Sequence, residues 1–192
     1  ELYPEAIERA VPLMQPGVCK IHFPLQVRHV SKGRDEIGGL LPDSPLSEGD
    51  VVPLISSQGV YTWPPTSGNV FAAGCLGKIL PMPEDEFRIC ADLYLCLKIA
   101  PLGEMRAANE PLGIYRIHGA NNHTRFSLEP KSLRQRALAY GLHQRLVDEV
   151  GGAGAGEHTW SIREAFEGAL LARRFGGGDP LPGVPDLPSL RL

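Results

Sequence analysis

The sequence predicts an α/β fold: a mixed sheet flanked by helices, with a helical extension at the C-terminal end. Stretches in which apolar and polar residues alternate, as in strands, are interspersed with stretches whose apolar residues recur at helical spacing. Clusters of Gly, Pro, Ser and Asp separate these stretches. Helices and strands mixed in this order indicate an α/β or α+β domain, and 192 residues suffice for one domain with a sizeable core.

The first two elements are a helix and a strand. In "YPEAIERAVPLM", Pro4 suits a first helical position and apolar residues recur at helical spacing. This predicts a short helix over about residues 4–13, which Pro12 and the following "QPG" end. "VCKIHFPLQV" (18–27) alternates apolar and polar residues and contains strand formers, so it predicts a strand that Pro24 interrupts or places at an edge.

The next region carries more turn signals than periodicity. Residues 31–50 are dense in Gly, Ser, Asp and Pro, which predicts a surface loop. "VVPLISS" and "VYTW" are short apolar pieces of uncertain type. The turn residues of "PPTSGN" precede a helix predicted near residues 69–78, with Thr66 and Ser67 as candidate N-caps.

The second half of the chain is more helical. "EFRICADLYLCLKIA" predicts a helix over 86–100 whose apolar residues share one buried side, and Pro101 and Gly103 end it. "EMRAANEPLGIYRI" then predicts two short strands with a break at "NEP". An amphipathic sequence pattern predicts a long helix over about 130–149, and a further helix is predicted over about 159–174.

These elements divide the chain into three parts. Residues 1–125 form the predicted main domain, and residues 126–175 supply helices that pack on it. Residues 176–192 contain too much Pro and Gly for a regular element and are predicted to be a tail.

Composition excludes several classes of protein. The net charge of -3 gives no basic footprint, so we expect no nucleic-acid partner. No apolar run approaches the about 20 residues of a membrane helix, and no leader resembles a signal peptide, so we expect a cytoplasmic protein without a transmembrane segment. The cysteines form no CxxC pair, which predicts reduced core residues in place of a zinc knuckle or disulfide framework. They are Cys19, Cys75, Cys90 and Cys96.

Three stretches carry candidate chemistry, and the first is "PPTSGN". Backbone N–H groups at a helix start, beside Ser and Thr hydroxyls and a Gly that allows close approach, suit a sugar hydroxyl or a phosphate. The same residues also fit an ordinary capped turn that binds nothing.

The second is Asp92, which lies in "RICADLYL" among apolar neighbours. Its carboxylate either faces solvent, as most helical Asp residues do, or points from a buried helix into a cavity. A partly desolvated carboxylate binds protons more tightly, which suits a general base near neutral pH. Glu84, Asp85 and Glu86 are better placed as first-turn acids that the helix dipole favours.

The third is "GIYRIHGANNH", where His118 and His123 lie five residues apart across loop residues. This is not the i, i+4 spacing of a helical zinc site, so we do not expect the loop alone to bind a metal. His118 as one ligand, with partners elsewhere in the chain, fits better. A small metal hydrolase is a further alternative, although its histidines lack ligand spacing. They would be His22, His29, His118 and His123.

In this order the three stretches resemble the acceptor-side half of family 2 inverting glycosyltransferases, which have the GT-A fold. In that family a Gly-containing segment precedes a helix, an acidic residue at the start of the next helix is the catalytic base, and a later strand ends in Tyr-Arg-x-His-like text. The matching positions are Ser67, Gly68 and Asn69, then Asp92, then Tyr115, Arg116 and His118. The resemblance covers roughly residues 1–125, and Ala91 replaces the Glu that commonly precedes the base.

The resemblance implies transfer of a sugar from a nucleotide-sugar donor, such as a UDP-sugar, to an acceptor hydroxyl of a glycan or other molecule, with inversion. It also implies a divalent metal (Mn or Mg) that neutralises the leaving diphosphate. The implied roles are catalytic base for Asp92, metal ligand for His118, phosphate contact for Arg116, and contact with donor sugar or acceptor for Ser67, Gly68 and Asn69.

The chain also departs from the family pattern. It opens at "ELYPEAIERA", text that in such enzymes follows an Asp-x-Asp metal motif, so we expect a nucleotide-binding half upstream and weak or no catalysis without it. An isolated acceptor-side half leaves a sheet edge and apolar surface to be covered by the C-terminal helices or a second copy, which predicts a homodimer. The alternative is a non-catalytic binding or assembly module derived from a glycosyltransferase.

Overall fold

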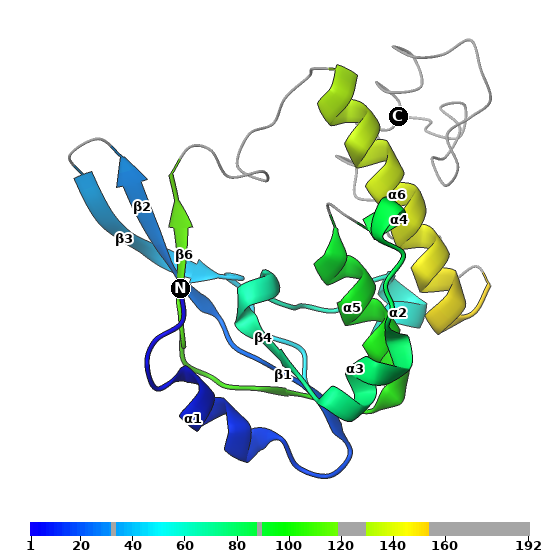
Figure 1. Cartoon of the computed structure of the whole chain (residues 1–192), viewed down its shortest axis with the longest axis horizontal. Helices are drawn as coiled ribbons and strands as arrows, with labels where there is room; N and C mark the ends of the chain where they lie inside the picture. The colour runs from blue at the N-terminus through cyan, green and yellow to red at the C-terminus, as the bar shows by residue number, and fades with distance from the viewer. Residues whose placement is uncertain (32–33, 88–89, 119–129, 154–192) are drawn as a thin grey trace.

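The protein has an α/β fold with mixed sheets and flanking helices, as the sequence predicts (Figure 1). The computed structural model describes residues 1–31, 34–87, 90–118 and 130–153. The predicted helix at 159–174 and the predicted tail at 176–192 lie outside the described residues.

Two three-stranded sheets run through the described part of the chain, in the orders β4-β1-β5 and β3-β2-β6. Their strands are β1 (Val18–His22), β2 (Leu25–Ser31), β3 (Arg34–Leu41), β4 (Asn69–Phe71), β5 (Glu104–Ala107) and β6 (Ile114–Ile117). The parallel pairs are β1 with β5 and β2 with β6, while β4 and β3 are antiparallel edge strands. The central strands of the two sheets, β1 and β2, are therefore consecutive in the chain, and together they form one central path through both sheets.

The central path breaks at Pro24, which confirms the predicted interruption. Proline has no N–H to give to a strand ladder, so β1 ends before it and β2 begins after it. Phe23 between the strands donates its N–H to the carbonyl of Gly68, 3.0 Å away. β5 and β6, the parallel partners of β1 and β2, are likewise separated by a break, which agrees with the break predicted at "NEP".

The prediction of a surface loop over 31–50 is wrong for Arg34–Leu41, which form β3. Pairing with β2 along its length supplies the hydrogen bonds that the glycine-rich sequence did not suggest. Most described side chains of β3 are exposed, so no apolar alternation is required. Gly38 suits its place, because a Cβ there would lie 3.2 Å from the side chains of Val27 and His29.

The helices flank these sheets. They are α1 (Ala6–Ala10), α2 (Val52–Gln58), α3 (Ala73–Ile79), α4 (Glu84–Phe87), α5 (Ala91–Ile99) and α6 (Pro130–Gly151), with 3-10 turns at Val11–Leu13, Thr66–Gly68 and Ala100–Leu102. The helices predicted over 4–13 and 130–149 are confirmed. The single helix predicted over 86–100 is instead two, α4 and α5, and "VVPLISS" is helical as α2.

The helix predicted near 69–78 is wrong in its first turn. Asn69–Phe71 pair with β1 as strand β4, and the helix begins only at Ala73. Thr66 and Ser67 lie in the preceding 3-10 turn, and the N-cap of α3 is Ala72 without a side-chain hydrogen bond. Sheet pairing thus overrides the local turn and capping signals.

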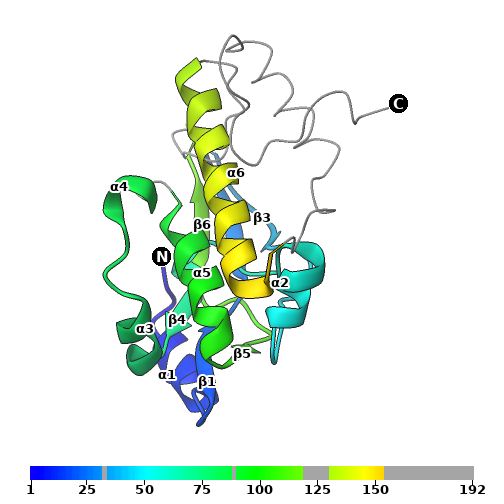
Figure 2. The same ribbon diagram turned by 90° about the vertical axis from the view of Figure 1, so that its right-hand side faces the viewer.

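The core has two parts, one on each side of the sheets. α1 packs with β1 and β2 in the smaller part. In the larger part α2, α3, α5 and α6 pack together, and Leu142, Leu146 and Val147 bring α6 into the buried interior. α6 runs alongside α5 (Figure 2). None of the helices in the described ranges has the length and apolar character needed to cross a bilayer.

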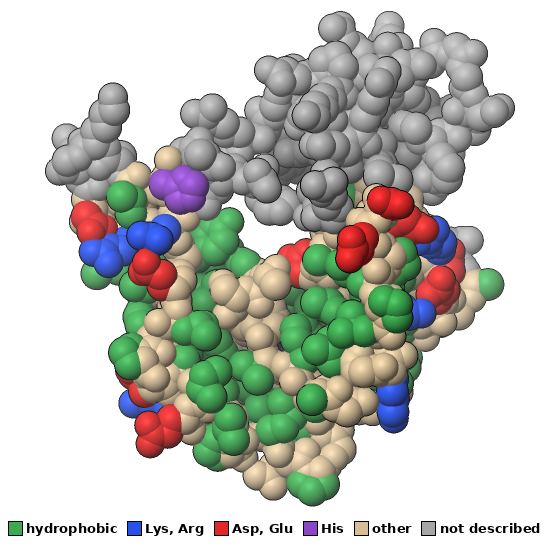
Figure 3. All heavy atoms as spheres, in the orientation of Figure 1, with side chains coloured by type: hydrophobic (Ala, Val, Ile, Leu, Met, Phe, Trp, Pro, Cys, Tyr) green, Lys and Arg blue, Asp and Glu red, His purple; other side chains and the backbone are tan. Residues whose placement is uncertain are grey.

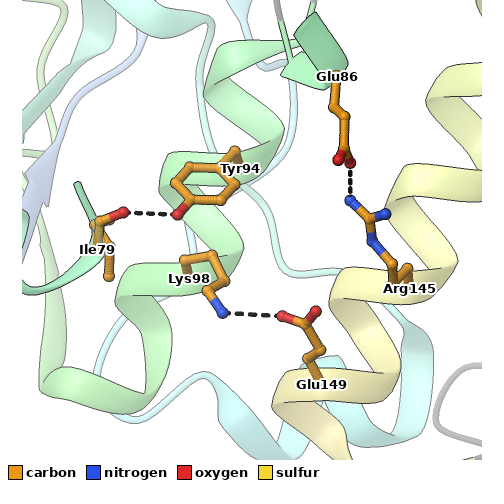
Figure 4. A network of polar contacts seen from close by, with 6 residues as sticks. All are labelled: Ile79, Glu86, Tyr94, Lys98, Arg145 and Glu149. Atoms are coloured by element: carbon orange, nitrogen blue, oxygen red, sulfur yellow. Dashed lines mark hydrogen bonds and ion pairs between the residues drawn. The ribbon is translucent and has the colours of Figure 1, made fainter. Parts of the chain in front are cut away.

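Polar contacts fix α6 against its neighbours (Figure 4). Lys98 of α5 forms an ion pair with Glu149 of α6 at 2.9 Å, and Arg145 of α6 pairs with Glu86 of α4. α5 is tied in turn to the end of α3, because the hydroxyl of Tyr94 donates to the carbonyl of Ile79 at 2.6 Å.

The prediction of four reduced cysteines is wrong for two of them. Cys19 of β1 and Cys75 of α3 form a disulfide, with a Cα–Cα distance of 5.8 Å, while Cys90 and Cys96 are free. The turn into α3 brings the pair together, since the N–H of Ala72 donates to the carbonyl of Cys19 at 2.9 Å. A tertiary contact across 56 residues leaves no spacing signal in the sequence.

Candidate functional site

A buried polar cluster lies between β1 and α5, and its centre is Lys20. This side chain is fully buried. Its Nζ donates to the hydroxyl of Tyr61 at 2.9 Å and to Sγ of Cys96 at 3.6 Å, and it lies 4.7 Å from the centre of the Tyr61 ring. Burial lowers the pKa of Lys20 to about 8, which the nearby Cys96 partly opposes. A lysine held in this way is harder to protonate than one in water.

His22 lies two residues along β1 and faces the same side of the sheet as Lys20. It is also fully buried, and its Nε2 lies 2.8 Å from the carbonyl oxygen of Ser47. A carbonyl can only accept, so Nε2 carries the proton. Nδ1 then has no hydrogen-bond partner among the described residues. Burial, followed by the charge of Lys20, lowers the pKa of His22 to about 3, so the ring is neutral at physiological pH.

Asp92 lies in the first turn of α5 and is half-buried. One carboxylate oxygen accepts the N–H of Leu93 at 3.0 Å, so the side chain folds back over the start of its own helix. Cys96 lies one turn further along, on the same face. Burial raises the pKa of the Cys96 thiol, and the negative charge of Asp92 adds to that rise, while Lys20 opposes it. The charge of Asp92 therefore acts on Cys96, a residue of the buried cluster.

Ser67 and Gly68 lie in the 3-10 turn before β4, and Asn69 is the first residue of β4. Ser67 is exposed, whereas Gly68 is packed so tightly that a Cβ would lie 2.7 Å from the carbonyl oxygen of Phe23. The amide nitrogen of Asn69 donates back to the carbonyls of Pro64 and Pro65, at 3.2 and 3.0 Å. Asn69 and Gly68 thus hold the shape of the turn.

Asn69 also connects this turn to α5, because its Oδ1 is 4.0 Å from Sγ of Cys96. β4 therefore contacts α5 at Cys96, in the second half of that helix, and two of the sequence-predicted segments, "PPTSGN" and the helix of Asp92, meet there. The meeting point is the buried cluster, in which Asn69 is paired opposite His22 across the ladder of β1 and β4.

Arg116 and His118 belong to the other sheet. Both are exposed, at and just beyond the end of β6, and Arg116 forms an ion pair with Glu1 at 3.0 Å. β6 ends and α5 begins toward the same end of the molecule (Figure 1). Charged side chains gather there on both sides, over β2, β3 and β6 and around α4 and α6, with mostly uncharged surface between them (Figure 3).

No group of three His, Cys, Asp or Glu side chains within the described ranges is arranged to hold a metal ion. His22, one residue of the metal-hydrolase alternative, is buried with Nε2 bonded to Ser47, and His123 lies outside the described residues. Within the described ranges His118 is therefore not part of a group of three such side chains.

Sequence reasoning missed the buried cluster itself. Lys20 and His22 alternate with apolar residues, a pattern that normally marks a solvated strand face. β1 is instead the central strand of its sheet, and α5 covers the face that carries Lys20 and His22. The available signal was Tyr61, an aromatic residue with a hydroxyl that can satisfy a buried amine, but its distance of 41 residues from Lys20 concealed the pairing.

Comparison with known proteins gives one significant sequence relative. An uncharacterized glycosyltransferase from Nostoc sp. is 37% identical over 78 residues, which are 41% of this chain and 24% of that protein. The match thus spans about a quarter of the relative's length. No family model matches the chain, and no solved structure matches it significantly.

Proposed function

We propose that the chain is the acceptor-side part of a glycosyltransferase that moves a sugar from a nucleotide-sugar to an acceptor hydroxyl with inversion. The observation that carries the proposal is the similarity to a protein named as a glycosyltransferase. The arrangement of the chain supports it, because Asn69 of "PPTSGN" contacts Cys96 of α5, so this segment packs on the helix that carries Asp92.

Asp92 is the proposed catalytic base. A half-buried carboxylate at a helix start is held in place by its contact with Leu93 and keeps one oxygen available to an acceptor. In the proposed step the acceptor oxygen attacks the anomeric carbon while its proton passes to Asp92. The bond from that carbon to the diphosphate oxygen breaks on the opposite face, which inverts the configuration.

The remaining residues would position the substrates. Ser67 is exposed on the turn that Gly68 and Asn69 shape, so it would meet a sugar hydroxyl. Arg116 and His118 would face the phosphates of the donor from the end of β6, where a guanidinium suits phosphate oxygens. The divalent metal implied by the resemblance has no ligand set within the described ranges, so no step is assigned to it.

The experiment is a transfer assay with the product of the complete reading frame, UDP- and GDP-sugars and a panel of glycan acceptors. Asp92→Asn should lower kcat by about 10²- to 10⁴-fold, the usual contribution of a general base. Asp85→Asn, an exposed acid on α4, is the matched control and should leave the rate unchanged. Both variants should keep the thermal midpoint of the parent.

Two outcomes would count against the proposal. The absence of any binding of UDP or GDP nucleotides by calorimetry, both to this chain and to the complete gene product, would remove the nucleotide-sugar enzyme. Undiminished transfer by Asp92→Asn would remove Asp92 as the base. Nucleotide binding lost in His118→Ala would support the position of that residue at the donor, whereas a non-catalytic assembly module predicts no effect of this change.

A further inference from the structure

A cavity lies between α2 and the chain segment that follows it. Its volume is about 270 Å³. It is lined by Ser47, Leu54, Gln58, Val60, Tyr61, Thr62 and Trp63. None of the residues proposed above for the sugar-transfer site lines it. We propose that this cavity binds one neutral pyranose ring of a glycan, stacked on Trp63, and this assignment to the acceptor rests on the proposed function.

The aromatic and apolar part of the lining suits the C–H face of a sugar. Tyr61 and Trp63 form an aromatic pair with ring centres 4.8 Å apart and planes tilted by 53°. Trp63 is half-buried, while Tyr61 is almost fully buried. The C–H face of a pyranose carries slightly positive hydrogens that suit the negative face of an aromatic ring. Leu54 and Val60 extend the apolar wall.

Polar groups on the same lining suit the hydroxyl edge of a sugar. The amide of Gln58 and the hydroxyl of Thr62 form no side-chain hydrogen bond within the described ranges. The hydroxyl of Ser47 accepts the N–H of Thr62 at 2.9 Å, which leaves its own proton to donate. A few placed polar groups on a mostly apolar wall are typical of small-molecule sites.

The absence of charge selects the ligand class. None of the residues that line the cavity is Lys, Arg, Asp or Glu. A diphosphate or a nucleotide would be left without a cationic partner there, whereas a neutral sugar needs none. The volume is also below the roughly 300–1,000 Å³ of pockets for drug-sized ligands, so it suits one ring of a longer chain.

The cavity is held in shape before any ligand arrives. The N–H of Ser47 donates to the carbonyl of Thr62 at 3.2 Å, in addition to the side-chain bond between these residues. Nε2 of His143 on α6 donates to the carbonyl of Gly59 at 2.9 Å. The hydroxyl of Tyr61 donates to the carbonyl of Cys96 at 2.9 Å, so the cavity backs directly onto α5, the helix of Asp92.

The test uses cellotetraose, mannotetraose and N-acetylchitotetraose as probes. The chain has two tryptophans, Trp63 and Trp160, so a Trp160→Phe version reports on Trp63 by fluorescence. At least one probe should change the emission saturably, and calorimetry with the parent chain should give the same Kd. Trp63→Ala should weaken binding at least tenfold by calorimetry, and Trp63→Phe, which keeps a stacking face, by less.

Gln58→Ala is a second variant at an exposed position, and it should also weaken binding without changing the thermal midpoint. The inference would be overturned if no probe gave a saturable signal. Equal binding by parent, Trp63→Ala and Gln58→Ala would overturn it too. Binding of a fatty acid with no binding of the three glycans would also overturn it. Because the probes contain no nucleotide, glycan binding with no transfer activity leaves this site standing while the proposed function fails.

Discussion

The amine of Lys20 donates a hydrogen bond of 2.9 Å to the hydroxyl of Tyr61, and both side chains lie inside the protein. The same tyrosine forms part of the lining of the cavity at Trp63. The buried cluster and the proposed sugar site therefore share a residue, and the stability of one bears on the shape of the other.

Lys20→Met should stabilise the protein at pH 7 by about 2 kcal/mol, since it removes a poorly compensated buried charge. The pKa of Lys20 is about 8 in the folded chain and 10.5 in the unfolded one. Between these values the unfolded chain keeps a proton that the folded chain has released, so this group adds stability as pH rises from 8 to 10.5. Urea unfolding of parent and variant across that window checks both points, with exposed Lys78→Met as control. A variant less stable than the parent at pH 7 would contradict this account.

His22 should make the protein sensitive to acid. Its pKa is about 3 when folded against 6.5 when unfolded, so below pH 6.5 the unfolded chain binds a proton that the folded chain does not. Stability from this group therefore falls as pH drops from 6.5 toward 3, by on the order of 5 kcal/mol in total. His22→Gln keeps a donor for Ser47 but does not titrate. Its unfolding free energy should depend less on pH in this window, and an unchanged slope would rule out His22 as the cause.

Gly68→Ala should destabilise the fold by about 2 kcal/mol or more, because the new Cβ would meet backbone and proline atoms within 2.8 Å. Gly74→Ala in α3 is the matched control, since a Cβ there meets nothing within 4 Å. Alanine is the better helix former, so the control should be neutral or more stable by up to about 1 kcal/mol. Thermal melts of both variants test the difference. Similar midpoints would show that the atoms around Gly68 move apart at little cost in free energy.

Thiol counting under denaturing conditions should find two free cysteines in the air-oxidised protein and four after reduction. The disulfide joins Cys19 to Cys75 and leaves Cys90 and Cys96 free. A loop of this length gives a chain-entropy stabilisation of about 4 kcal/mol as an upper figure. The Cys19→Ser, Cys75→Ser double variant should thus melt at a lower temperature. Four free thiols without reductant would show that Cys19 and Cys75 are reduced, as the sequence predicts.

The homodimer stays a prediction. β3 is an edge strand, and Ile37 on it is 78% exposed, a combination that favours pairing with a second copy. Light scattering after size exclusion should show a dimer at high concentration, and Ile37→Lys should shift the chain toward the monomer. A parent that stays monomeric at every concentration would contradict the prediction.

The sequence predicts those features that depend on local chemistry. Pro24 cannot continue a ladder, and the strand ends there; the amphipathic text of α6 gives a helix where expected. The sequence predicts Asp92 inside a helix, but it lies in the first turn of one, because α4 and α5 are separate helices. What could not be predicted depends on distant partners: β3 needs β2, Cys19 needs Cys75, and Lys20 needs Tyr61.

α6 completes the interior that α5 begins. Leu142, Leu146 and Val147 fill the side of the core that the sheet leaves open, and ion pairs anchor the helix at both α4 and α5. A shortened protein that stops at residue 125 would expose the apolar surface that α6 covers, and it should aggregate or bind chaperones. We therefore expect the smallest autonomous unit to extend through α6.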